Sequence, residues 1–199
     1  MSSAALAGGC GSYDGASVPM ITYSGQRINL GHIHADDVRV EDVAHALSLI
    51  CRAGGHIRHF YSVAQHSLNC LYEAKARGHR REVQQACLLH DAGEAYLSDV
   101  IRPVKALLPD YRQLEKRVEE AVHMAFGLDA LTECEWSDVR AVDDVMLHNE
   151  FLLLRDDLVV FSEPPLCLCP PDVREQPPHI VRALFLEQFS GLQKHGNPV

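Results

Sequence analysis

The sequence lacks any long hydrophobic run and any cluster of basic residues. No window reaches the roughly 18 unbroken apolar residues that a membrane-spanning helix needs. The opening stretch MSSAALAGGCGSYDG has neither the basic start nor the apolar centre of a signal peptide. Lysine and arginine total 18 against 27 aspartates and glutamates, and the net charge of -9 disfavours binding to a nucleic-acid polymer. We therefore expect a cytoplasmic protein that binds neither membranes nor nucleic-acid chains.

The cysteines do not form a pattern typical of disulfides. Their number is seven, which is odd. Cys51, Cys70 and Cys87 fall within helix-like apolar patterns, where a free cysteine behaves as a small buried hydrophobe. Cys167 and Cys169, which lie between prolines in PPLCLCPP, could face solvent. We expect all of them to be reduced, as is usual in the cytoplasm.

Length and composition indicate one globular domain. A chain of 199 residues with 47% hydrophobic residues can bury one sizeable core. Residues 1–16 are small, Gly-rich and aperiodic, so we expect a flexible tail there, followed by a single domain over residues 17–199. Short β-like runs around a Ser-Gly turn in PMITYSGQRINL predict a small hairpin at the start of this domain.

Helical periodicity dominates the rest of the chain and predicts an all-α fold. Ser62 and Gln65 have the spacing of a capping box, so we expect a helix to begin there and to stop at Gly78. The other expected helices cover residues 40–52, 81–95, 110–127, 137–157 and 179–195, with loops over 97–105 and the proline-rich stretch 162–178.

A histidine and an aspartate, His90 and Asp91, stand side by side at the end of an apolar run. Each needs a polar partner that leucine cannot supply. In the helix expected over residues 81–95, His90 and Glu94 share a face with the apolar stripe, and Asp91 lies about 100° further round. Taken alone, the pair is typical of a hydrogen-bonded helix end. An earlier histidine, His66, and a later aspartate make it part of a set of four potential metal ligands.

Imidazole plus carboxylate suits one divalent transition metal such as Mn, Co, Fe, Ni or Zn better than Mg or Ca alone. Two residues of VRAVDDVMLHNE compete as the later aspartate. Asp143 shares a helical stripe with Leu147 and Glu150, whereas Asp144 points with Arg155. We therefore favour Asp143 as a ligand and expect Glu150 to have a supporting role.

The order of these residues resembles that of the HD-domain metal-dependent phosphohydrolases, whose motif is H…HD…D on a bundle of helices. Four segments, CRAGGHIRHFYSVAQHS, LLHDAGEAYLSDVIRPVK, YRQLEKRV and VRAVDDVMLHNE, are similar to those of bacterial and phage 5'-deoxynucleotidases and cover most of residues 40–154. The resemblance implies an HD-domain helical bundle and a homo-oligomer. It also implies one divalent metal bound by His66, His90, Asp91 and Asp143.

The resemblance further implies roles in chemistry and in substrate binding. Glu94 matches a catalytic carboxylate that handles a proton. Arg52 matches an arginine that contacts the substrate phosphate, with Arg58 as the alternative in the same loop. Asp99 matches an acidic residue that reads the sugar hydroxyls, and Lys105 matches a lysine that reaches phosphate. Both are expected in a loop, where recognition is usually placed.

One position departs from those relatives. They carry a tryptophan just after the arginine, where this chain has Ala53, so we expect Phe60, Tyr61 or Tyr96 to stack on the base. The implied activity converts deoxynucleoside 5'-monophosphates to deoxynucleosides and phosphate. Two alternatives stay open. One is a deoxynucleoside triphosphohydrolase that releases tripolyphosphate, for example from dATP; the other is an inactive HD module that binds metal or nucleotide, against which the retained Glu94 argues.

Overall fold

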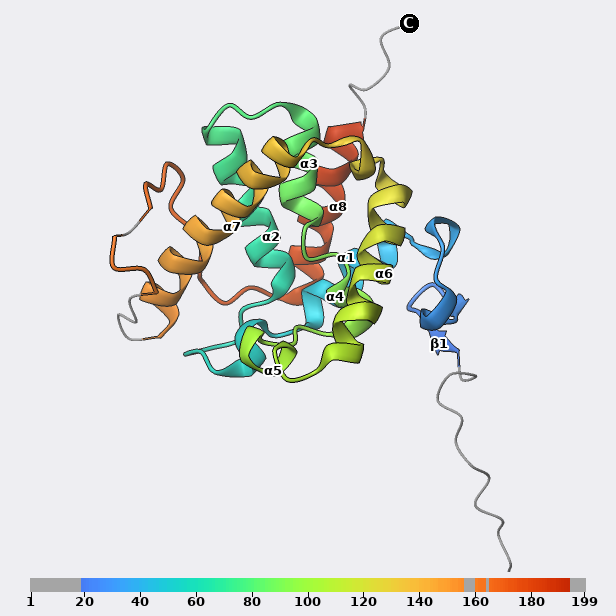
Figure 1. Cartoon of the computed structure of the whole chain (residues 1–199). Helices are drawn as coiled ribbons and strands as arrows, with labels where there is room; N and C mark the ends of the chain where they lie inside the picture. Colours follow the sequence, from blue (N-terminus) through green and yellow to red (C-terminus); the bar gives the residue numbers. More distant parts are fainter. Residues whose placement is uncertain (1–18, 156–159, 164, 194–199) are drawn as a thin grey trace, which may run out of the picture.

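The computed structural model describes residues 19–155, 160–163 and 165–193, which form a mostly helical body (Figure 1). The expected all-α fold is confirmed, while the tail expected over residues 1–16 lies outside the described part. No helix in that part combines the length and the apolar character needed to cross a membrane. The helices are α1 (Val40–Leu49), α2 (Val63–Ala76), α3 (Arg81–Leu89), α4 (Glu94–Leu97), α5 (Arg102–Lys105), α6 (Pro109–Phe126), α7 (Glu133–Leu154) and α8 (Pro178–Gln193).

The small hairpin predicted from the sequence is present. Strand β1 (Met20–Ile21) pairs antiparallel with β2 (Arg27–Ile28). Gly25 in the turn has a φ of 84°, a left-handed conformation that glycine adopts without steric cost. The amide and the hydroxyl of Ser24 donate to the Asp42 carboxylate at 2.6 and 2.8 Å. These two bonds tie the hairpin to α1.

The hydrophobic core lies where α2 and α3 pack against each other and against α7 and α8 (Figure 1). Leu71 of α2, Leu88 of α3, Met146 of α7 and Phe185 of α8 have at most 1% of their surface exposed. Leu47 of α1 is fully buried as well, and α1 packs along α8. This packing holds α2, α3 and α7 in fixed positions relative to one another.

Both ends of α2 follow local signals in the sequence. The Ser62 hydroxyl accepts the Gln65 amide at 3.2 Å, and Gln65 Oε1 accepts the Ser62 amide at 3.3 Å, which is the predicted capping box. Gly78, with a φ of 73°, follows the last turn as predicted, and Gly127, with a φ of 68°, ends α6 in the same way. The start of α2 is therefore fixed at Val63, which places His66 in its first turn.

Helix α1 ends three residues before its predicted end at Arg52. Cys51 forms a β-bridge with Ser62 instead, and the Arg52 amide donates to the Tyr61 carbonyl at 2.9 Å. The backbone hydrogen bonds of these residues are thus made to another segment rather than within a helix. Cys51 is consequently half-buried outside a helix, contrary to the prediction, whereas Cys70 and Cys87 are buried in helices as predicted.

The helix predicted over residues 81–95 is interrupted. Helix α3 ends at Leu89 and α4 begins at Glu94. Between them, backbone amides donate to the carbonyl three residues earlier, for example the Glu94 amide to the Asp91 carbonyl at 3.0 Å. Winding of this type advances about 120° per residue instead of about 100°. Glu94 therefore follows His90 across a tighter turn instead of along one continuous helix, and both residues line one small pocket.

Residues 97–105, predicted as a loop, contain the short helix α5. Lys105 therefore closes a helical turn instead of lying in a loop. Pro103 fits the first turn of α5 because its missing N–H would have no partner there.

Helix α7 begins at Glu133, four residues before its predicted start. Thr132 and Glu135 form a capping box that the prediction did not use: the Thr132 hydroxyl accepts the Glu135 amide at 3.3 Å, and Glu135 Oε2 accepts the Thr132 amide at 2.9 Å. The helix ends at Leu154, earlier than predicted, and Arg155 follows as its cap.

The proline-rich stretch runs along α2 and is held there by side chains at four-residue intervals, Gln65, Asn69 and Glu73. Glu73 is fully buried and accepts the amides of Leu168 and Cys169 at 3.0 and 2.6 Å. Gln65 and Asn69 bond backbone groups further along the stretch. A segment without helix is thus fixed by buried polar groups.

Candidate metal centre

The four ligands predicted from the sequence lie together although three separate elements carry them. His66 belongs to α2, His90 and Asp91 follow α3, and Asp143 lies near the middle of α7. Nε2 of His66 is 3.2 Å from Nε2 of His90 and 3.2 Å from Oδ1 of Asp143. Oδ2 of Asp91 is 3.3 Å from Nε2 of His90. One ion could bind all four, because ligands about 2.0–2.2 Å from a metal stand about 3.0–3.5 Å apart.

Both histidines are held through Nδ1, so that Nε2 faces the cluster. Nδ1 of His66 donates to Glu150, whose two oxygens are each 3.0 Å away. Nδ1 of His90 donates to the Cys87 carbonyl at 2.9 Å. A proton on Nδ1 leaves the lone pair on Nε2, the atom through which each ring would bind a cation. The cluster therefore has the outer hydrogen bonds that metal-binding histidines usually make.

Cys70 also lies beside the cluster, one turn along α2 from His66. Its Sγ is 3.5 Å from Nε2 and 3.9 Å from Nδ1 of His66, so the sulfur lies alongside the ring rather than beyond Nε2. Burial raises the pKa of this thiol well above its ordinary value, and the charges of Asp143 and Glu150 add to the effect. The ligand atoms of His66, Cys70, His90 and Asp143 all lie within 4.8 Å of one another, so Cys70 belongs to a second possible ligand set, which requires loss of the thiol proton.

Arg52 reaches into the same cluster. Its guanidinium is 3.3 Å from Asp91, 3.6 Å from Asp143 and 3.3 Å from Glu150, and 11% of its side chain is exposed. Burial alone would lower the pKa of Arg52, but these three carboxylates raise it above its ordinary value. A permanent cation therefore stands next to the predicted ligands.

The two competing aspartates of α7 differ in their contacts. Asp143 is within ion-pair distance of His66, His90 and Arg52, and among the described residues Asp144 makes no ion pair with any of the three. Although burial opposes it, the hydrogen bonds with His66 and His90 hold the pKa of Asp143 well below its ordinary value. The geometry thus agrees with the preference for Asp143.

Glu94 lies beside the cluster, at the start of α4. Its Oε2 is buried and has no hydrogen-bond partner among the described residues. Burial, with the nearby charges of Asp91 and Asp99, raises the pKa of Glu94 to about 9. A buried acceptor without a partner is costly, so this oxygen is suited to a ligand or a water that enters the cavity.

A cavity of about 600 Å³ opens beside these residues. Its wall includes Arg52, Asp91, Glu94 and Asp143, and its volume is typical of pockets for small molecules. Arg102 also lines it: its guanidinium is 3.6 Å from Oδ2 of Asp143, yet 74% of the side chain is exposed. We did not predict a role for Arg102, and the only signal in the sequence was its place in RPVK, three residues before Lys105.

The remaining predicted binding residues are divided between the cavity and the surface. Asp99 and Lys105 both line the cavity. Asp99 accepts the Ala53 amide at 2.8 Å, and Lys105 pairs with Glu115. Arg58 is exposed and is not among the described residues that line the cavity. Of the two loop arginines, Arg52 is therefore the one beside the candidate centre.

The three aromatic residues expected to stack on a base do not line the cavity in the described part of the chain. Tyr61 is fully buried and donates its hydroxyl to Glu150 at 2.7 Å, and Tyr96 is 6% exposed. Phe60 is half-buried and also lies outside the lining. None of the three is therefore placed to stack on a base bound in this cavity, whereas Phe151 of α7 lines it.

Comparison with known proteins finds bacterial relatives. The chain is 37% identical over 129 residues, 65% of its own length and 68% of the relative's, to the uncharacterized protein YfdR of Escherichia coli. It is 34% identical over 174 residues, 81% of its length and 89% of the relative's, to the uncharacterized protein RCAP_rcc00048 of Rhodobacter capsulatus. The chain belongs to the family of these two proteins. No model of a protein family matches it.

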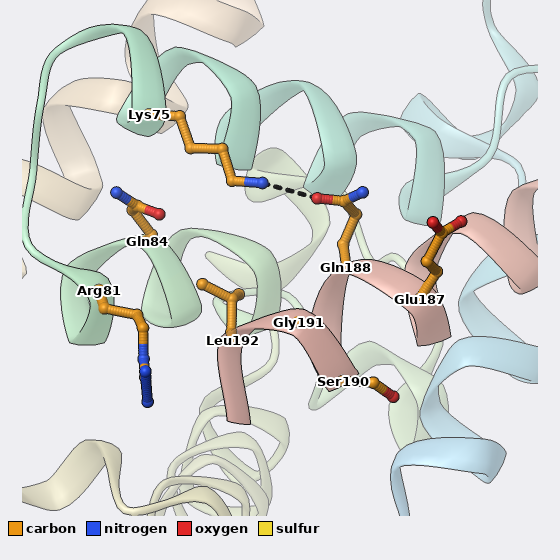
Figure 2. Close-up of a pocket in the computed structure, with 8 residues that line it drawn as sticks. All are labelled: Lys75, Arg81, Gln84, Glu187, Gln188, Ser190, Gly191 and Leu192. Atoms are coloured by element: carbon orange, nitrogen blue, oxygen red, sulfur yellow. Dashed lines mark hydrogen bonds between the residues drawn. The ribbon is translucent and has the colours of Figure 1, made fainter. Parts of the chain in front are cut away.

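A second cavity of about 640 Å³ lies between α2, α3 and α8 (Figure 2). Figure 2 shows Lys75 of α2 joined to Gln188 of α8, at 2.6 Å. Among the described residues, the lining of this second cavity has one carboxylate, Glu187, and no histidine or cysteine. This cavity therefore lacks the donor set found beside His66.

Proposed function

We propose that this chain is a mononuclear metal-dependent phosphohydrolase of the HD-domain type, which hydrolyses deoxynucleoside 5'-monophosphates to deoxynucleosides and phosphate. One observation carries the proposal. His66 and His90 are both fixed through Nδ1 and turn Nε2 toward each other and toward Asp91 and Asp143. A pair of buried helix-end residues without a ligand would not need this arrangement.

The order and setting of these residues add support. His66, the adjacent His90 and Asp91, and Asp143 follow each other along the chain as in the H…HD…D motif, and a mostly helical body carries them. The donor set suits Mn, Co, Fe, Ni or Zn. A divalent ion bound there would polarise a phosphate oxygen and lower the pKa of a water molecule.

Cationic side chains beside the ligands suit a phosphate group. The buried guanidinium of Arg52 lies within 3.6 Å of Asp91 and Asp143, so it can bind phosphate oxygens and offset the charge that develops during phosphoryl transfer. Arg102 and Lys105 line the same cavity and add positive charge at its edge. Arg102 is exposed and has room to close on an anion, whereas Lys105 is held by Glu115.

Glu94 and Asp99 are assigned the remaining roles. Glu94 lines the cavity next to Asp91 with one oxygen free of protein partners in the described part. It would take the proton of the attacking water or give a proton to the leaving sugar oxygen. Asp99, which accepts the Ala53 amide, would face the sugar hydroxyls.

Product analysis tests this function. The purified protein, treated with chelator and reloaded with Mn or Co, is incubated with deoxynucleoside mono- and triphosphates beside the Asp91→Ala variant. We expect phosphate from monophosphates with wild-type protein and none with the variant. Tripolyphosphate from a triphosphate would show a triphosphohydrolase instead. The absence of any metal-dependent product would contradict the proposal and favour a module that only binds metal or nucleotide.

A further inference from the structure

One face of α7 follows the cavity from the candidate metal centre outward. Asp143, Leu147 and Phe151 stand four residues apart on α7, Arg155 follows its last residue, and all four line the cavity. At 1.5 Å per residue, Asp143 and Phe151 are about 12 Å apart along the helix axis. The wall of the cavity therefore continues for about two helical turns beyond the predicted ligands.

The character of this wall changes along its length. Near Asp143 it is charged, because Arg52 and Arg102 lie within 3.6 Å of this carboxylate. Two turns on, it presents Phe151, which is half-buried, and the guanidinium of Arg155 lies 5.5 Å from the centre of the Phe151 ring. The far part of the cavity thus offers a flat aromatic surface with a planar cation beside it.

A short segment after α7, at residues 160–163, contributes to the wall of the same cavity. The Phe161 amide donates to Nδ1 of His148 at 3.3 Å, and the rings of these two residues stack with centres 5.9 Å apart. The neighbouring Val160 lines the cavity together with Phe151 and Leu147. The surface around Phe151 is therefore apolar as well as aromatic.

We infer that Phe151, with Arg155 beside it, binds the base of the nucleotide. The inference rests on the proposed function. In a nucleotide whose phosphate is bound near Asp143, the sugar separates phosphate and base, which directs the base along α7 toward Phe151. Every nucleobase has an aromatic face that can stack on a phenyl ring or a guanidinium plane. Such stacking favours nucleotides over phosphate esters without a base and discriminates only weakly among bases.

The test compares a substrate with a base and one without it. We would measure kcat/KM of the metal-loaded protein for dAMP and for deoxyribose 5-phosphate, in wild type, Phe151→Leu and Phe151→Trp. The matched control is Phe126→Leu, which removes a half-buried ring that packs against Phe189 and does not line the cavity. Phe151→Leu should lower kcat/KM for dAMP about tenfold to a hundredfold, the usual loss of one base stack. It should leave deoxyribose 5-phosphate unchanged, and Phe151→Trp should keep the preference for dAMP.

Several outcomes would overturn the inference while the proposed function stands. One is hydrolysis of dAMP by Phe151→Leu at the wild-type rate and KM. Another is an equal loss for both substrates, which would assign Phe151 to the phosphate end or to the fold.

Equilibrium dialysis with dAMP distinguishes failure of the proposed function from failure of the inference about Phe151. If wild-type protein binds dAMP without hydrolysing it and Phe151→Leu loses that binding, the proposed function fails and Phe151 still binds the base. If wild-type protein does not bind dAMP, both fail.

Discussion

Nδ1 of His66 donates to Glu150, with both carboxylate oxygens 3.0 Å away, and neither side chain has exposed surface. Glu150 also accepts the Tyr61 hydroxyl at 2.7 Å and lies 3.3 Å from Nε of Arg52. Although burial opposes it, these neighbours keep the pKa of Glu150 below its ordinary value, so the carboxylate is charged. Asn69 donates to the Tyr61 hydroxyl at 2.7 Å, which connects this network to the proline-rich stretch on α2.

Replacing Glu150 by glutamine should weaken metal binding by His66. The amide keeps one acceptor but loses the charge that supports the Nδ1 proton, and changes of this kind typically cost about tenfold to a hundredfold in metal affinity. Titration of the chelator-treated protein with Co²⁺ measures the effect. Glu187→Gln, on the exposed side of α8, serves as the control. A folded Glu150→Gln protein with wild-type Co²⁺ affinity would show that Glu150 does not support metal binding by His66.

Glu94→Gln should separate metal binding from turnover. Glu94 is not among the predicted ligands, so the variant should keep its metal. It should lose about a hundredfold to ten-thousandfold in kcat, the usual contribution of a positioned proton donor or acceptor. Metal content by elemental analysis and phosphate release are measured on the same sample, with exposed Glu120→Gln of α6 as the control. Near-wild-type turnover would mean that another group moves the proton.

Glu135 predicts a pH dependence of stability. The hydrogen bond from Arg80, together with the bonds from Thr132, lowers the pKa of Glu135 to about 2. Because the folded-state pKa lies below the unfolded value of about 4.3, the stabilising effect is present above that pH and is lost as the pH falls toward 2. Glu135→Gln should therefore lower the melting temperature at pH 7, and the gap should narrow below about pH 4. A gap that does not change with pH would contradict a charge-based role.

Much of the fold follows from local signals in the sequence. The capping box at Ser62 and Gln65 and the glycines after α2 and α6 mark helix ends correctly because each acts on its own backbone neighbours. The break after Leu89 was missed because it depends on tertiary contacts. His90 and Asp91 contact His66 on α2, and His90 also contacts Asp143 on α7. The pattern of apolar residues within 81–95 carries no information about these contacts.

In the site, too, the residues indicated by helix geometry could be predicted, whereas those placed by tertiary contacts could not. Asp143 could be preferred over Asp144 because helix geometry alone places it with Leu147 and Glu150. Phe151 lies eight residues after Asp143 on that helix, and its role does not follow from the sequence, because only the cavity shows that the helix is open so far along α7. The position of Arg102 does not follow from the sequence, because α5, which places it beside Asp143, lies where a loop is predicted.

The most direct measurement is the rate of phosphate release from deoxynucleoside 5'-monophosphates by Mn- or Co-loaded protein, in wild type, Asp143→Asn and Asp144→Asn. The two variants change the same chemical group at adjacent positions of α7, and only Asp143 is within 3.7 Å of both histidines. We predict metal-dependent release by wild type and Asp144→Asn, and a loss of both metal and release in Asp143→Asn. Equal activity of the two variants, or release that needs no metal, would contradict a metal centre built on His66, His90, Asp91 and Asp143.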